Sequence, residues 1–154
     1  MQNTKMLQDF IKTNKLSAEI IQCTGEVHTA VKAAAQVDDP EAAAKSIVLI
    51  DSDEEPLLVI LLGKNKIDFQ KIKEILKVKD VRLAEPEEVL RITGYEVGGV
   101  PPISIYGIKT FIDKAVVEKE EIFCGGGDPN HLMKIKTKEI LENVDEISIE
   151  DVKK

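Results

Sequence analysis

The chain has 154 residues, of which 43% are hydrophobic and 32% charged, and this composition is typical of a globular protein. Its net charge of −7 argues against a general nucleic-acid binder, because nonspecific affinity for phosphates needs a basic surface. The longest apolar run, 56–63, is too short to cross a bilayer, and the N-terminal residues do not show a secretory signal. We therefore expect one domain over residues 1–154, located in the cytoplasm, with no membrane and no DNA partner.

The chain alternates helical and extended patterns from its start. Apolar residues at helical spacing predict an amphipathic helix from Thr4 to Asn14, and Thr29 and Asp68 are predicted to cap later helices. Further helices are predicted over 30–36, 69–76, 86–92 and 114–118 and from Thr137 onward. Strands are predicted over 19–24, 46–51, 57–63, 81–84, 103–107, 110–113, 120–126 and 132–136, and residues 146–151 are predicted to form a strand or an extended tail. This irregular order favours an α+β fold with a curled sheet over regular βαβ winding.

Two cysteines and two histidines are the soft ligands that a zinc site would need. They are Cys23, His28, Cys124 and His131, and they do not recur at the spacing of a metal motif. We therefore expect no metal and no cofactor. Cys124 ends a hydrophobic strand, which is typical of a packed thiol, so a thiol enzyme that uses Cys124 is the weakest of the functional alternatives.

Two glycine-rich segments stand out, TGYEVGGVPP (93–102) and GGGDPNH (125–131). Glycine leaves main-chain groups uncovered and proline fixes φ, so such segments can form a rigid wall of amides and carbonyls around a small ligand. The alternatives are a stiff connection for the first segment and an ordinary hairpin for the second. The second segment lacks the lysine and hydroxyl residue of a phosphate-binding P-loop.

Lys45 lies between an alanine-rich turn and an apolar strand, where a core pattern would place an aliphatic residue. A lysine in this place can bury its stem while its ammonium reaches a cleft. The alternative is an ordinary charge at the edge of the sheet.

Five motifs occur in a characteristic order. They are HTAVKAAA (28–35), AAKSIVLI (43–50), TGYEVGGVPP (93–102), TFID (110–113) and FCGGGDPNHLMKI (123–135). Together they resemble the YbaK/EbsC family of aminoacyl-tRNA editing domains, which also occur inserted in bacterial prolyl-tRNA synthetases. The resemblance runs from about Glu19 to Val144. It implies a mixed, barrel-like curled β-sheet of about six to seven strands with helices packed outside.

The resemblance also implies the site. It gives catalytic roles to Lys45, near the terminal adenosine of a tRNA, and to the main chain of Gly99. The substrate-binding residues that it implies are Thr29, Val100, Pro101, Gly125, Gly126, Gly127, Asp128 and His131. Two departures leave the amino-acid specificity open: residues 19–27 contain no tyrosine, and the second glycine loop is longer than the compact loop of the family.

The activity implied by the resemblance is that of a trans-acting deacylase. It would hydrolyse the ester of a mischarged small amino acid (Ala, Ser or Cys) at the acceptor end of a tRNA, with an aminoacyl-tRNA synthetase as a further partner. A second site of this kind is needed because a small difference in side-chain size gives a synthetase only about 10–200-fold discrimination. The alternative function is a non-catalytic module that binds a small amino-acid-like or nucleotide ligand.

Overall fold

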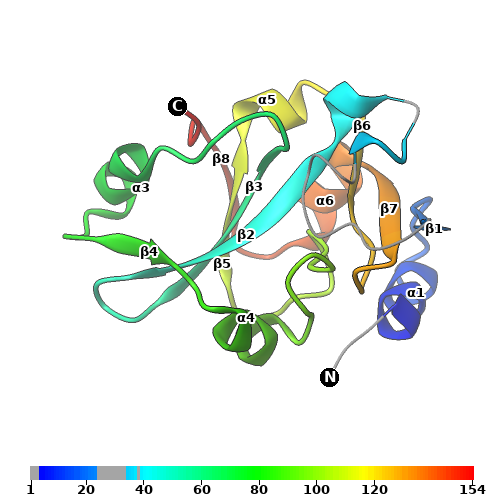
Figure 1. The fold of residues 1–154 in the computed structure, drawn as a ribbon, viewed down its shortest axis with the longest axis horizontal. Coiled ribbons are helices and arrows are strands. Elements are labelled where there is room, and N and C mark those ends of the chain that lie inside the picture. Colours follow the sequence, from blue (N-terminus) through cyan, green and yellow to red (C-terminus); the bar gives the residue numbers. More distant parts are fainter. Residues whose placement is uncertain (1–3, 24–33, 38) are drawn as a thin grey trace.

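The structure is a computed structural model that describes residues 4–23, 34–37 and 39–154. Its elements in chain order are α1 (Thr4–Thr13), β1 (Glu19–Gln22), η1 (Pro40–Ala42), β2 (Ala44–Asp51), β3 (Pro56–Leu62), α3 (Phe69–Leu76), β4 (Val81–Leu83), α4 (Pro86–Thr93), β5 (Lys109–Asp113), α5 (Lys114–Val117), β6 (Glu121–Gly125), β7 (His131–Lys136), α6 (Thr137–Asn143) and β8 (Ile147–Glu150). Figure 1 shows α3 at one end of the molecule and α1, β1 and β7 at the other, with the long strand β2 running between them.

The strands form two sheets. One has the order β1-β7-β6 and is antiparallel, and the other has the order β4-β2-β3-β5-β8 with parallel pairs β3–β5 and β5–β8. A single parallel bridge between Ala43 and Phe123 joins the start of β2 to β6. The α+β class is confirmed. The strands number eight instead of six to seven, and in the described part of the chain they do not close into a barrel, so the barrel-like closure is not confirmed.

Helix ends follow the capping residues that the sequence contains. The Asp68 carboxylate accepts hydrogen bonds from the amides of Gln70 and Lys71, which confirms it as the cap of α3. Gly94 ends α4 with a φ of 83°, a conformation that glycine adopts at little cost. The predicted cap Thr29 and its helix over 30–36 fall largely outside the described residues, so the structure does not test them.

The predicted strand over 103–107 is wrong. This segment is an irregular loop in which Ser104 and Gly107 have positive φ values of 65° and 74°, and two such residues cannot continue a strand. The fully buried Tyr95 anchors the loop, because its hydroxyl donates to the Ser104 hydroxyl at 2.9 Å. The alternating Ile-Ser-Ile-Tyr pattern therefore reflects a packed loop.

Two apolar clusters cover the two faces of the five-stranded sheet. The inner cluster lies between the sheets and includes Leu7, Ala44, Val48, Ile60, Ile112, Cys124 and Met133. The outer cluster lies under α3 and includes Leu49, Leu57, Val59, Leu61, Ile72 and Phe111. Strands β2 and β3 therefore have both faces covered, as their continuous apolar runs predict. None of the helices in the described ranges is long and apolar enough to span a membrane.

Candidate functional site

The two glycine segments meet in the structure. The amide of Gly127 donates to the carbonyl of Gly99 at 2.9 Å. A Cβ added at Gly125 would lie 2.2 Å from the Val100 carbonyl oxygen, and one added at Gly99 would lie 2.6 Å from the Asp128 main chain. Real Cβ atoms do not approach so closely, so both positions require glycine. The result is a wall in which two stretches of main chain lie against each other.

The second glycine segment turns the hairpin between β6 and β7. Gly126 donates its amide to the His131 carbonyl at 3.2 Å, and Gly127 has a φ of 102°, which glycine adopts readily. This confirms the hairpin interpretation of the sequence. The hairpin and the wall are compatible, because Gly126 and Gly127 turn the chain while Gly125, just before them, leaves room for Val100.

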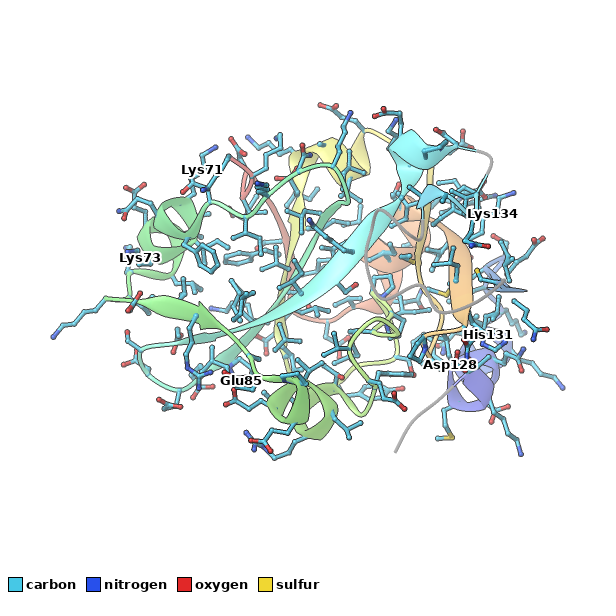
Figure 2. All side chains as sticks on the ribbon, in the orientation of Figure 1. Lys71, Lys73, Glu85, Asp128, His131 and Lys134 are labelled. Carbon is cyan, nitrogen blue, oxygen red and sulfur yellow. The ribbon has the colours of Figure 1, made fainter. Side chains whose placement is uncertain are left out.

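Asp128 and His131 form a side-chain pair in this hairpin. The Asp128 Oδ1 atom lies 2.7 Å from His131 Nδ1, and it also accepts the Asn130 amide at 2.8 Å. The two side chains are 28% and 24% exposed, so both remain reachable from solvent. Figure 2 shows them together beside α1, at the start of β7. Partial burial raises the pKa of Asp128, but hydrogen bonds from His131, Asn130 and Thr4 outweigh it and hold that pKa below its usual range.

Thr4, the first residue of α1, reaches the same loop from the other end of the chain. Its hydroxyl lies 2.9 Å from Asp128 Oδ2 and 2.9 Å from the Gly126 carbonyl oxygen. Sequence reasoning missed this residue. A threonine at the start of a helix gives no signal of a partner more than 120 positions away.

Lys45 and Gly125 both face away from the inner cluster. Ala44 and Cys124 both belong to the inner cluster, so their neighbours Lys45 and Gly125 face the opposite side. The Ala43–Phe123 bridge brings these strands together two residues before Lys45 and Gly125. The main chain of Val100 occupies the space on that side of Gly125.

The Lys45 ammonium donates to the Gly63 carbonyl at 3.3 Å, a partner that the sequence did not suggest. Burial lowers the pKa of Lys45, and the nearby positive charge of Lys66 lowers it further. The side chain is half-buried, as expected for a lysine whose stem is covered. The hydrogen bond to Gly63 places the ammonium at the end of β3.

The remaining sequence candidates divide into three groups. Val100 and Pro101 are buried beside Gly99, while Thr29 lies outside the described residues together with His28.

Cys124 is 1% exposed and its Sγ atom donates to the Met133 carbonyl, and burial raises the pKa of its thiol. This environment disfavours the thiolate that a nucleophilic cysteine needs. Within the described residues, no group of three or more His, Cys, Asp or Glu side chains is placed to hold a metal.

Residues 24–142 match the family model of the aminoacyl-tRNA editing domain. The chain is 30% identical over 115 residues to the proline–tRNA ligase of Halalkalibacterium halodurans, covering 75% of this chain and 20% of that enzyme. It is 29% identical over 100 residues to the uncharacterized protein YwhH of Bacillus subtilis, covering 64% of this chain and 63% of that protein. The chain thus spans about a fifth of the ligase.

A solved structure, described as a candidate trans-editing enzyme for prolyl tRNA synthetase, has the same fold. The TM-score is 0.84 and the sequence identity is 25%, and the match covers 98% of this chain and 96% of that one. The similarity therefore extends beyond the segment matched by the family model to the elements on both sides of it, α1 and β8 among them.

Proposed function

Because the chain belongs to the aminoacyl-tRNA editing domain family, we propose that it is a trans-acting deacylase for mischarged tRNA. Its substrate is an ester between a small amino acid (Ala, Ser or Cys) and the terminal ribose of the tRNA. The relatives named for proline–tRNA ligase and for trans-editing of prolyl tRNA synthetase support tRNA for proline as the carrier. The observation that carries the proposal is the wall of paired main chain at Gly99 and Gly125, together with the Ala43–Phe123 bridge that joins β6 to the start of the strand carrying Lys45.

This wall suits selection by size. Because the Val100 carbonyl and the Asp128 main chain fill the space beside the two glycines, the wall cannot yield to a larger side chain without backbone movement. Rigidly held main-chain groups can also orient the ester at little ordering cost. A pocket that admits alanine, serine or cysteine and excludes larger residues provides the second sieve that a synthetase lacks.

The reaction requires little chemical activation, because an aminoacyl ester is already reactive. A water molecule attacks the ester carbonyl carbon. A hydroxyl of the substrate's own ribose can orient that water, whereas its own attack would only move the ester to another ribose oxygen. The bond from the carbonyl carbon to the ribose oxygen breaks, the ribose oxygen takes up a proton, and the products are the free amino acid and the tRNA. Holding the reactants in place can supply up to about 7–11 kcal/mol of the barrier in the best cases.

Lys45 is proposed to bind the terminal phosphate or ribose of the tRNA. Burial and the nearby positive charge of Lys66 lower the pKa of Lys45, and a bound anion beside its ammonium would relieve this repulsion. The net charge of −7 disfavours contacts with many phosphates, so we propose that the protein recognises the acceptor end rather than the whole tRNA.

A panel of mischarged tRNAs tests the proposal. Alanyl-, seryl- and cysteinyl-tRNA for proline are incubated with the protein, with correctly charged prolyl-tRNA as the control, and the loss of ester is followed over several turnovers. We expect catalytic hydrolysis of at least one mischarged species. Binding of the same species without turnover would instead identify a non-catalytic module and would overturn the proposal.

A further inference from the structure

Helix α1 lies outside the segment that matches the family model, yet it touches the glycine hairpin inside that segment. Its position is fixed by the core, because Leu7 is fully buried in the inner cluster and Phe10 and Ile11 pack against the same cluster. The first turn of the helix therefore stands at a defined place beside the hairpin, as Figure 2 shows for α1 and the labelled Asp128.

The Thr4 hydroxyl and the Asp128 carboxylate connect this helix to His131. Thr4 Oγ1 is 2.9 Å from Oδ2 of Asp128, and the other carboxylate oxygen, Oδ1, is 2.7 Å from His131 Nδ1. Each oxygen thus has its own partner, and the carboxyl plane cannot rotate without losing one of them. Thr4 Oγ1 also lies 2.9 Å from the Gly126 carbonyl, so its single hydrogen is shared between two acceptors of one loop.

An ionised carboxylate accepts hydrogen bonds and donates none, so the close contact with Asp128 places a proton on Nδ1 of His131. In the neutral ring, Nε2 is then the acceptor. Resting on the proposed function, we propose that Thr4 is a positioning residue of the editing site. It fixes the Asp128 carboxylate, which in turn holds His131 with Nε2 as an acceptor for an N–H or O–H group of the bound aminoacyl ester.

A merely structural tie between α1 and the hairpin is the competing explanation. It would make Thr4 important for stability and leave the state of Asp128 irrelevant to activity. Among the described residues, the titratable side chain in contact with Asp128 is His131, while Gly99 meets it with main chain and Cys23 binds the neighbouring Asn130 through its amide. Protonation of Asp128 is therefore a specific probe of the proposed chain of contacts.

The test compares Thr4→Val, which keeps the side-chain shape, with Thr4→Ser, which keeps the hydroxyl. Thr13→Val, at the exposed end of the same helix, is the matched control. Deacylation is measured between pH 3 and 8 at a temperature at which circular dichroism shows all variants folded. We expect kcat of Thr4→Val to fall about tenfold, equal to about 1.4 kcal/mol, with KM nearly unchanged. Thr4→Ser should regain most of the loss.

The pH profile adds a readout that packing does not move. Hydrogen bonds, including that from Thr4, lower the pKa of Asp128, so its carboxylate persists to lower pH than usual. Without the Thr4 hydroxyl this pKa rises, and activity is lost at a higher pH as the solution is acidified. The acidic limb of Thr4→Val should therefore move to higher pH, and that of Thr13→Val should not.

Nuclear magnetic resonance of the two histidine rings separates this proposal from the proposed function. In the wild type, the His131 ring should show a proton on Nδ1, and Thr4→Val should reduce that population even if the protein deacylates nothing. A His28→Gln variant assigns the signals, since the chain has two histidines. Equal activity, equal pH limbs and equal ring signals in Thr4→Val and Thr13→Val would overturn the inference, as would equal losses in Thr4→Val and Thr4→Ser.

Discussion

Two aspartates in this protein show how the same side chain serves architecture in one region and remains available in another. Asp113 is fully buried, and its two oxygens accept the amides of Val152 and Ala115. Asp128 is 28% exposed and has a threonine hydroxyl and an imidazole among its partners. Asp113, which also lies 3.5 Å from the Lys153 ammonium, is closed off from solvent, whereas the partly exposed carboxylate of Asp128 can respond to a ligand. The comparison shows that the carboxylate of the glycine hairpin, and not that of the buried junction, can change its hydrogen-bond partners.

The same contrast extends to the main chain in each region. Around Asp113, β5 pairs with β3 on one side and with β8 on the other, so the main-chain N–H and C=O groups of β5 have hydrogen-bond partners. At the hairpin, two glycines let one loop rest on another. The first region gains stability from strands paired on both sides, and in the second two loops are held together by the hydrogen bond from the Gly127 amide to the Gly99 carbonyl.

The largest expected effect is that of a methyl group placed between the two loops. Gly125→Ala would bring a Cβ to 2.2 Å from the Val100 carbonyl, so the Gly99–Val100 segment must move away. We expect deacylation to fall more than about 100-fold, since a displacement of about 1 Å alone can cost that much. Gly107→Ala is the control: it has a φ of 74° but open space around the new methyl group, so it should cost about 1–2 kcal/mol of stability without loss of activity. Equal activity in both variants would show that the wall does not form the pocket.

Exchanging each aspartate for asparagine sharpens the comparison. Asp113→Asn puts an amide donor against a buried main-chain donor, and we expect the free energy of unfolding to fall by about 2–4 kcal/mol with little change in kcat of the folded fraction. Asp128→Asn should cost less than about 1 kcal/mol of stability, because the side chain is partly exposed, but should lower kcat about tenfold or more. Chemical unfolding and single-turnover kinetics measure the two effects. If Asp128→Asn changed only stability, the hairpin would be as purely architectural as the Asp113 junction.

The sequence predicted the parts of the fold that depend on local chemistry. The cap at Asp68, the glycine end of α4 and the apolar runs of β2 and β3 were all readable, because each rests on residues within a few positions. The loop over 103–107 was not, because its course depends on the buried Tyr95 hydroxyl that holds Ser104. An alternating pattern predicts a strand only when no tertiary contact, such as that of Tyr95 with Ser104, bends the chain.

The candidate site divides in the same way. Both glycine segments were found from their composition, but their contact at Gly99 and Gly125 depends on tertiary packing. Thr4 and Gly63 were missed for the same reason, since each meets its partner only after α1 and the end of β3 have docked. Lys45 is predicted as a site residue because a charge at the start of an apolar strand conflicts with its surroundings, and such conflicts are expected at functional sites.

The most direct measurement of the central claim is the deacylation rate of Lys45→Ala beside that of Lys73→Ala, a charge-matched variant on α3 at the other end of the molecule (Figure 2). Lys45→Ala should remain folded, because the side chain is only half-buried and its burial already disfavours the charged ammonium. We predict that its kcat/KM on the best mischarged tRNA is about 10–100-fold lower than that of the wild type, and that Lys73→Ala matches the wild type. A Lys45→Ala rate within about twofold of the Lys73→Ala rate would contradict the account.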